Sequence, residues 1–233
     1  IPENCFDGSG FDGNLTLHDG ITSIGSSAFA HCPLKGELKL PKNLTAIAEN
    51  AFYGCDFSGE LKIPTAVRAI GSHAFAYNWR LMGVLEFPEG LQSIGAGAFA
   101  KCSSIEGLIF PESLESIRYE ASGNEDGGAF QNCFGVSSIV CKGDMPAYVQ
   151  NGAFDGVAKD NFTLEVPESA IQQYQAASGW KDFKRIAAHH ELVCRPSVAS
   201  ALSTEHKQKL VINAEGEWEV ASKPDWCEVS PAS

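Results

Sequence analysis

The sequence predicts an α/β repeat solenoid: a right-handed stack of units of about 23 residues, each with short strands and a short helical turn. The main observation is a phenylalanine that recurs at a nearly fixed interval. It stands at Phe6, Phe29, Phe52, Phe75, Phe99, Phe130 and Phe154, with successive differences of 23, 23, 23, 24, 31 and 24. A period of roughly 20–50 residues is typical of stacked repeats, in which each unit buries its apolar face only against its neighbours.

Other columns keep step with the phenylalanine. In the copy at residues 59–79, alternation turns Leu61 and Ile63 inward and Lys62 outward. Pro64 ends that strand because proline has no N–H to donate, and residues 72–75 are expected to form the helical turn. The matching columns are the glycines that open each first strand (Gly13, Gly36, Gly59, Gly83, Gly107), the isoleucines (Ile24, Ile47, Ile70, Ile94) and the prolines (Pro41, Pro64, Pro88, Pro111).

Four of the eight cysteines form a further column, three residues after the phenylalanine. They are Cys32, Cys55, Cys102 and Cys133, and Asn78 replaces the cysteine once. A buried thiol behaves as a small apolar residue, so this position favours free thiols in the core. A disulfide is the alternative in an extracellular setting. The sequence has no CxxC motif, which argues against structural zinc.

The repeated pattern GxLxLPxxLxxIGxxAFxxC resembles the BspA-like leucine-rich repeats of bacterial surface proteins, especially those of Bacteroides-type bacteria. The resemblance covers residues 1 to about 188. It implies an extracellular location on the bacterial surface, with any signal peptide already removed, and binding to host matrix proteins or to other cells. Because the chain begins inside a repeat, we expect either that the natural protein extends upstream of Ile1 or that the first copy is a degraded cap.

Two segments of the repeat region depart from the pattern. An insertion at 118–129, rich in glycine and polar residues, predicts a surface loop. Its Glu120, Glu125 and Asp126 are oxygen ligands suited to calcium, although the EF-hand spacing is absent. At about 168–186 we expect a helical cap that closes a 1–188 domain. Its helix runs over 170–178 between a Ser169 cap and Gly179, with Trp180, Phe183 and Ile186 covering the open end of the core.

Residues 189–233 lack the period and predict a small all-β segment. The runs KLVINA and EWEVAS alternate as strands around a turn at Glu215-Gly216. The end of the chain is similar to the BACON module, a small β-sandwich with an immunoglobulin-like fold, through Trp218, Pro224, Asp225, Trp226, Val229, Ser230 and Pro231. The segment is short for that sandwich, so we expect an incomplete module or a shorter relative.

Composition and motifs exclude several classes of function. The net charge of −12 argues against nucleic acid and anionic membranes, which attract basic surfaces. We find no GxSxG, Walker, HExxH or dinucleotide motif, so we predict no enzyme activity and no cofactor. The histidines His18, His31 and His73 occupy variable repeat positions, and adjacent His189 and His190 would point to opposite sides of a strand, which argues against a metal site.

Two outward columns are candidate binding surfaces. The first is charged: Thr16, Lys39, Lys62 and Glu86, with Glu37 and Glu60 beside them. Stacked strands would place Lys39 over Lys62; the alternative reading is a solvated charge ladder. The second combines Tyr53, Tyr77 and Trp79 with Arg80, residue types that are enriched in binding hot spots. Its alternative is that the rings only pad the side of the helical turns.

These observations predict a non-enzymatic, monomeric adhesion or binding module for a host matrix or cell-surface protein, since a solenoid offers a long rigid face. The alternative, suggested by the BACON-like tail, is an accessory or spacer module of a glycan-processing system that binds polysaccharide or mucin. Binding to purified matrix proteins would favour the first. A glycan signal that depends on the tail would favour the second.

Overall fold

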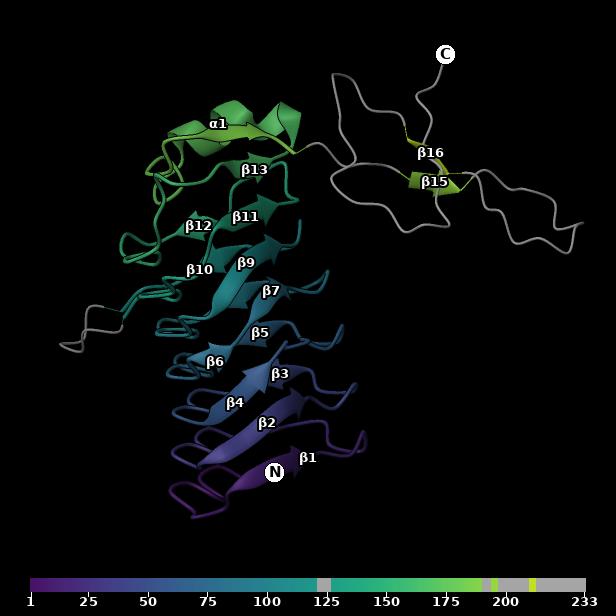
Figure 1. Ribbon diagram of the computed structural model, residues 1–233, viewed down its shortest axis with the longest axis vertical. Helices are drawn as coiled ribbons and strands as arrows, with labels where there is room; N and C mark the ends of the chain where they lie inside the picture. Colours follow the sequence, from purple (N-terminus) through teal and green to yellow (C-terminus); the bar gives the residue numbers. More distant parts are fainter. Residues whose placement is uncertain (121–126, 190–193, 197–209, 213–233) are drawn as a thin grey trace, which may run out of the picture. The chain divides into compact units, whose positions relative to one another are not determined.

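The computed structural model describes residues 1–120, 127–189, 194–196 and 210–212 of the 233-residue chain. The chain divides into two compact units, Ile1–His189 and His190–Ser233. The first unit is a parallel β-solenoid of about seven turns with little helix, as Figure 1 shows. The repeat stack predicted from the period is therefore confirmed.

Three parallel sheets run along this solenoid. Two of them form one side of the solenoid, which we call the strand face. In the first copies the strand-face sheet has the order β1-β2-β4-β6, with β1 (Gly13–Thr16), β2 (Leu34–Lys39), β4 (Asp56–Gly59) and β6 (Arg80–Leu81). The strand-face sheet of the later copies contains β7 (Gly83–Glu86), β9 (Ile105–Phe110), β11 (Ser138–Cys141), β13 (Leu164–Val166) and β14 (Ile186–Ala188). The third sheet contains β3 (Ala46–Ile47), β5 (Ala69–Ile70), β8 (Ser93–Ile94), β10 (Ser116–Ile117) and β12 (Tyr148–Val149).

The phenylalanine column forms a continuous stack of rings through the core. Neighbouring rings from Phe6 to Phe154 are stacked, with centroids 5.2 to 5.6 Å apart. This spacing follows the separation of about 4.8 Å between hydrogen-bonded strands, because one ring is supplied by each turn. Stacked aromatic pairs stabilise beyond their buried area, so the column fixes the register of the copies.

The expected helical turns around these phenylalanines are instead tight turns. In one copy, the N–H groups of His73, Phe75 and Tyr77 each donate to a carbonyl of the next copy at 2.8 Å. His73 and Tyr77 have φ of 53° and 64°, in the left-handed region. An α-helix requires right-handed backbone throughout, so the segment hydrogen-bonds between copies instead of along itself.

The cysteine column is a ladder of buried donors. Each member donates to the carbonyl of the phenylalanine in the preceding copy: Cys32 to Phe6 (2.9 Å), Cys55 to Phe29 (3.2 Å), Cys102 to Phe75 (3.1 Å) and Cys133 to Phe99 (3.1 Å). Asn78 Nδ2 does the same to Phe52 at 2.8 Å, which explains why asparagine can occupy this position. These four cysteines are free and buried, as predicted.

The glycine column opens a strand as expected at Gly13 of β1 and Gly83 of β7, but not in the other copies. Gly36 lies inside β2, which begins at Leu34, and Gly59 is the last residue of β4. Both have positive φ, 74° and 84°. A glycine with positive φ in a strand bends it and shifts its pairing, so this column marks a kink in the strand face.

The C-terminal end of the first unit is capped by aromatic side chains. Trp180 and Phe183 are buried against Phe154, and Trp180 Nε1 donates to the carbonyl of Ala147 at 2.8 Å. Figure 1 shows α1 (Ile171–Ala176), which follows the short 3₁₀ helix η1 (Glu168–Ala170), across this end of the stack. Trp180 and Phe183 thus lie where the sequence placed them, and Ile186 pairs in β14, the last strand of the sheet, while its partly buried side chain packs against the core.

The expected helix limits at 170–178 were wrong. The N-cap residue of α1 is Ala170, and it makes no side-chain cap hydrogen bond. Ser169 Oγ instead donates to Asp144 Oδ1 of the preceding copy at 2.6 Å.

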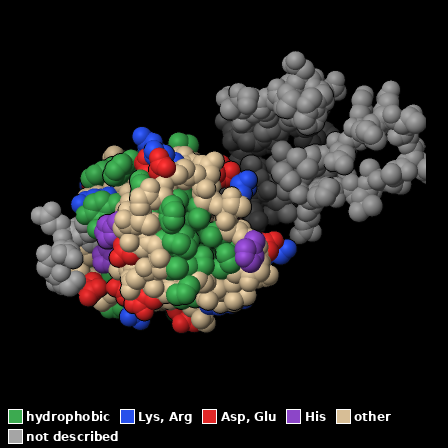
Figure 2. Space-filling model, turned by 90° about the horizontal axis from the view of Figure 1, so that it is seen from below, with side chains coloured by type: hydrophobic (Ala, Val, Ile, Leu, Met, Phe, Trp, Pro, Cys, Tyr) green, Lys and Arg blue, Asp and Glu red, His purple; other side chains and the backbone are tan. Residues whose placement is uncertain are grey.

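The opposite end of the first unit exposes apolar side chains. Figure 2 shows hydrophobic atoms gathered at the centre of this end, with charged groups around them. Five apolar residues pack there against the core while staying partly exposed: Ile1, Phe6, Leu15, Leu17 and Ile21.

The insertion at 118–129 is described only at its base. Tyr119 and Gly128 form an antiparallel bridge, and Tyr119 N–H donates to Gln150 Oε1 at 2.8 Å. Glu125 and Asp126 lie outside the described residues, so the calcium alternative stays a prediction.

In the second unit, β15 (Cys194–Pro196) and β16 (Leu210–Ile212) form an antiparallel pair. The strand β16 lies within the run KLVINA. The expected turn at Glu215-Gly216 and the BACON-like residues lie outside the described part of the chain.

Candidate interaction surfaces

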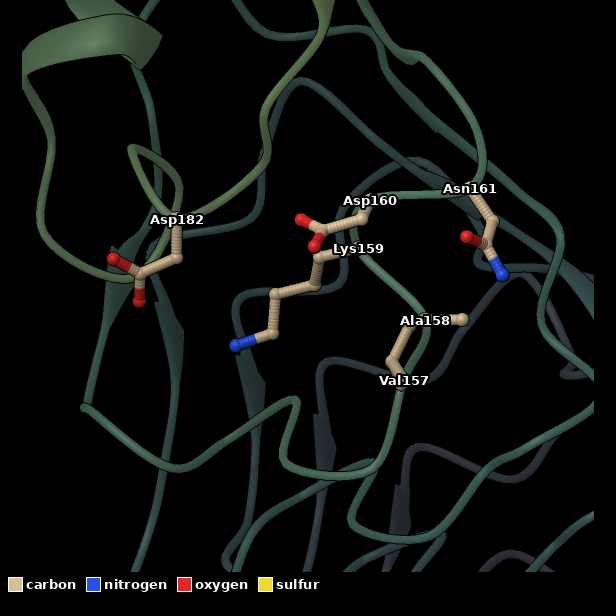
Figure 3. A pocket seen from close by; sticks show the side chains of 6 residues that line it. All are labelled: Val157, Ala158, Lys159, Asp160, Asn161 and Asp182. Carbon is tan, nitrogen blue, oxygen red and sulfur yellow. The ribbon is translucent and has the colours of Figure 1, made fainter.

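A shallow hollow lies between the last turns of the first unit. It is lined by the stretch Val157–Asn161 and by Asp182, shown in Figure 3. Asp160 already pairs with Lys184 at 2.5 Å. Within the described ranges, no group of three or more histidine, cysteine or acidic side chains is placed to hold a metal ion. The side chains around the hollow are mostly polar: Lys159, Asp160, Asn161 and Asp182.

The buried thiols have the environment of structural residues. Burial raises the pKa of the Cys55 and Cys102 thiols from 9.0 to about 12 and also raises that of the Cys133 thiol well above its ordinary value. A nucleophilic or metal-binding cysteine needs a lowered pKa and access to solvent. The cysteine column therefore belongs to the core.

The aromatic candidates Tyr53 and Tyr77 belong to a column on the side of the phenylalanine turns. Their ring centroids are 5.2 Å apart, and His31 approaches Tyr53 edge-on at 5.1 Å. Lys101 Nζ lies 4.5 Å above the Tyr77 ring and donates to its hydroxyl at 3.0 Å. Because these side chains contact one another and are half-buried, the geometry favours mutual packing, the padding alternative, over a preformed ligand site.

Of the charged candidates, only Thr16 and Lys39 are paired across neighbouring strands as the expected vertical ladder requires. Lys39 pairs with Glu37 of its own strand at 3.6 Å, and the residue opposite Lys39 in the neighbouring strand is Thr16. Lys62 is exposed in the run 60–64, which is not in a strand and so cannot hold it over Lys39. Such exposed pairs contribute at most about 1 kcal/mol each.

The other predicted site residues, Trp79, Arg80 and Glu86, lie within eight residues of one another in the sequence. Trp79 is 53% exposed and directly precedes β6, whereas Arg80 pairs with Asp56 at 3.3 Å. Glu86, at the end of β7, pairs with Lys142 at 2.9 Å. The structure adds two apolar residues that the sequence reading did not select, Met82 and Val84, which are 49% and 50% exposed.

A signal for this region was present in the sequence. The interval from Phe75 to Phe99 is 24 residues instead of 23, because the run from Asn78 to Pro88 is one residue longer than the run from Cys55 to Pro64. An extra residue in one strand produces a bulge, which re-aims neighbouring side chains.

Comparison with known proteins agrees with this architecture. The sequence profile of the BspA type leucine rich repeat region matches residues 1–126, in six copies, which is more than half of the chain. The chain belongs to this family. No curated protein matches it.

Among solved structures, the chain is similar to a leucine rich cell surface protein from Faecalibacterium prausnitzii A2-165. The two are 16% identical, and the similarity covers 82% of this chain and 63% of that one, with a TM-score of 0.33. The chain thus spans less than two thirds of that protein's length. The Bacteroides-type and BACON resemblances stay predictions. Across the described residues, no helix is long and apolar enough to cross a membrane.

Proposed function

We propose that this BspA-type repeat protein is a non-catalytic binding module displayed outside the bacterial cell, where its rigid stack presents a face to a host matrix or cell-surface protein. The observation that carries this proposal is the ring stack from Phe6 to Phe154, which holds successive copies in a fixed register. Side chains on different copies are thereby held at fixed separations without a ligand, which lowers the entropic cost of binding a large partner.

Two further points support it. The surfaces described above carry exposed charged and aromatic side chains, which are residue types suited to binding a macromolecule. A cell-surface location is also the one stated for the leucine rich protein of Faecalibacterium prausnitzii.

The proposal is tested by measuring binding of the full chain to a panel of purified extracellular matrix and cell-surface proteins by biolayer interferometry. We expect at least one saturable protein interaction. A glycan array should be run in parallel, because a sugar signal without any protein signal would replace this proposal with the carbohydrate-binding alternative. Antibody labelling of intact cells tests the location, and a signal that appears only after lysis would contradict it.

A further inference from the structure

The strand face changes its pairing at Met82. Before Met82, strand β6 pairs with β4 of the preceding copy, with Arg80 opposite Ser58 and Leu81 opposite Gly59. From Gly83 onward, strand β7 pairs with β9 of the following copy. Met82 is the residue between these two strands, and its N–H donates to the Gly59 carbonyl at 3.0 Å. The strand face is thus divided into two sheets at Met82.

Three large apolar side chains within six residues are exposed near this break: Trp79 in the turn before β6, and Met82 and Val84. Leu81 and Leu85 are buried, so alternation along the extended run directs Met82 and Val84 outward. Trp79, Met82 and Val84 are each about half exposed; we call them the coil-break patch. Single exposed apolar residues need no explanation, whereas a group of them indicates an interaction site.

The charges around the patch are not balanced. Arg80 is neutralised by Asp56 and Glu86 by Lys142. Glu60 and Glu106 are exposed, and neither makes an ion pair within the described residues.

Both of these glutamates lie beside the break. A Cβ at Gly83 would come within 3.1 Å of Glu60 Cγ, so the Glu60 side chain lies against Gly83. Glu106 is the residue left over where the register shifts, since Gly83 lies opposite Ile105 and Val84 opposite Gly107. The patch is therefore an apolar centre with an uncompensated carboxylate contributed by the copy on either side.

We propose that the coil-break patch docks a protein whose surface presents apolar side chains flanked by lysine or arginine. This inference rests on the proposed function and names the site and the chemistry of the partner. Tryptophan, methionine and arginine are enriched in protein interfaces, and the core of such a patch is depleted of charge. Basic groups on the partner would complement Glu60 and Glu106, and the net charge of −12 on the whole chain would speed the approach of a basic protein.

A sugar chain fits this patch less well than a protein does. Carbohydrates need hydrogen-bond donors and acceptors around each stacking ring, and unmet hydroxyl groups are costly. The aliphatic neighbours Met82 and Val84 offer neither donors nor acceptors of useful strength.

The test uses the full chain and a phage-displayed random peptide library, followed by titration of synthetic versions of the enriched peptides. We expect these peptides to combine apolar and basic residues. Replacing Met82→Ser together with Val84→Ser should weaken their binding at least about 10-fold, in the range of a hot spot. The matched control is Met145→Ser, which alters a methionine that is 73% exposed on another turn and should change binding less than about 2-fold.

A pair of charge-reversal substitutions tests whether the carboxylates of Glu60 and Glu106 contribute to binding. Glu60→Lys with Glu106→Lys should slow association and flatten its dependence on salt, since exposed charges act mainly on the encounter rate. Glu49→Lys, on another exposed carboxylate, should leave both unchanged. Thermal melts of every variant establish that it is folded.

Four results would overturn the inference: enriched peptides that bind the Met82/Val84 variant as tightly as the parent; enriched peptides without basic residues; a glycan-array signal abolished by the same variant; or a parent dimer in analytical ultracentrifugation that this variant dissociates. If matrix proteins bind the parent and the variant equally, the inference fails and the proposed function stands. If library peptides require the patch but no matrix or cell-surface protein binds, the proposed function fails and the inference stands.

Discussion

On the side of the phenylalanine turns, each copy repeats the contacts of the one before it, whereas on the strand face the sheet changes partner at Met82. The turn side has an uninterrupted ring stack from Phe6 to Phe154 and one ladder of side-chain donors. The strand face has two sheets, glycine kinks and a register shift between Gly83 and Val84.

The difference arises because the repeated side chains of the turn side are buried, whereas the outward side chains of the strand face are solvated. A buried ring or thiol has one place in the stack, so an altered interval there would open a cavity or leave a carbonyl without its donor. An outward strand position is solvated, and an extra residue costs little there as long as neighbouring strands recover their pairing. The turn side is therefore expected to carry the stability of the first unit and the strand face its recognition.

The largest expected effect is on the turn side. Phe75→Ala removes a fully buried ring that stacks on Phe52 and Phe99, and we expect it to lower the free energy of unfolding by about 3–5 kcal/mol. Urea unfolding followed by circular dichroism measures this loss. An unchanged midpoint would show that the ring column does not support the fold.

Most of the turn side was predictable from the sequence, because its columns are buried and periodic. The ring stack, the free cysteines and the aromatic cap at Trp180 and Phe183 all followed from spacing and residue type. The turn conformation did not. His73 and Tyr77 occupy left-handed backbone that favours glycine, and only the glycines and asparagines at the same positions in other copies hinted at it.

Less of the candidate site was predictable. Trp79, Arg80 and Glu86 were selected by type, and the structure places them around the coil-break patch. Met82 and Val84 were missed, because a single extra residue in an interval of 24 does not reveal which residue the bulge exposes. Lys39 was expected over Lys62, but strand pairing is set by backbone kinks that side-chain columns do not report.

Alkaline pH should weaken the thiol ladder. In the unfolded chain the thiols ionise near pH 9, whereas burial raises the pKa of Cys55 and Cys102 to about 12. The folded state then holds more protons than the unfolded state between these values, so stability falls as pH rises. At pH 10 the loss is about 1.4 kcal/mol for each of the two thiols.

Urea midpoints at pH 7.5 and pH 10 measure this slope. Cys102→Ala should flatten it, whereas Cys5→Ala, which changes an exposed cysteine, should keep the slope of the parent. A Cys102→Ala variant as sensitive to pH as the parent would contradict the assignment of the loss to the buried thiols.

A smaller effect, of opposite sign, is expected at the one asparagine of the ladder. Asn78 is fully buried, and its Oδ1 has no hydrogen-bond partner although Nδ2 donates to the Phe52 carbonyl. Asn78→Cys keeps a donor and removes the unsatisfied acceptor, so we expect a gain of about 1 kcal/mol in the free energy of unfolding. A calorimetric melt of the variant beside the parent measures it. A lower melting temperature would mean that the amide contributes more through its donated bonds than its buried oxygen costs.

The smallest expected effect is on the strand face. Because Met82 and Val84 are half exposed, Met82→Ser and Val84→Ser should each change the free energy of unfolding by no more than about 0.5 kcal/mol. The same urea titration that detects Phe75→Ala gives this value. A loss as large as that of a buried residue would mean that the two side chains hold the two sheets together across the break, and the division between a stabilising turn side and a recognising strand face would then no longer hold. A stability close to that of the parent would leave these positions free to serve a partner, because nothing in the fold itself would then account for the apolar surface at Met82 and Val84.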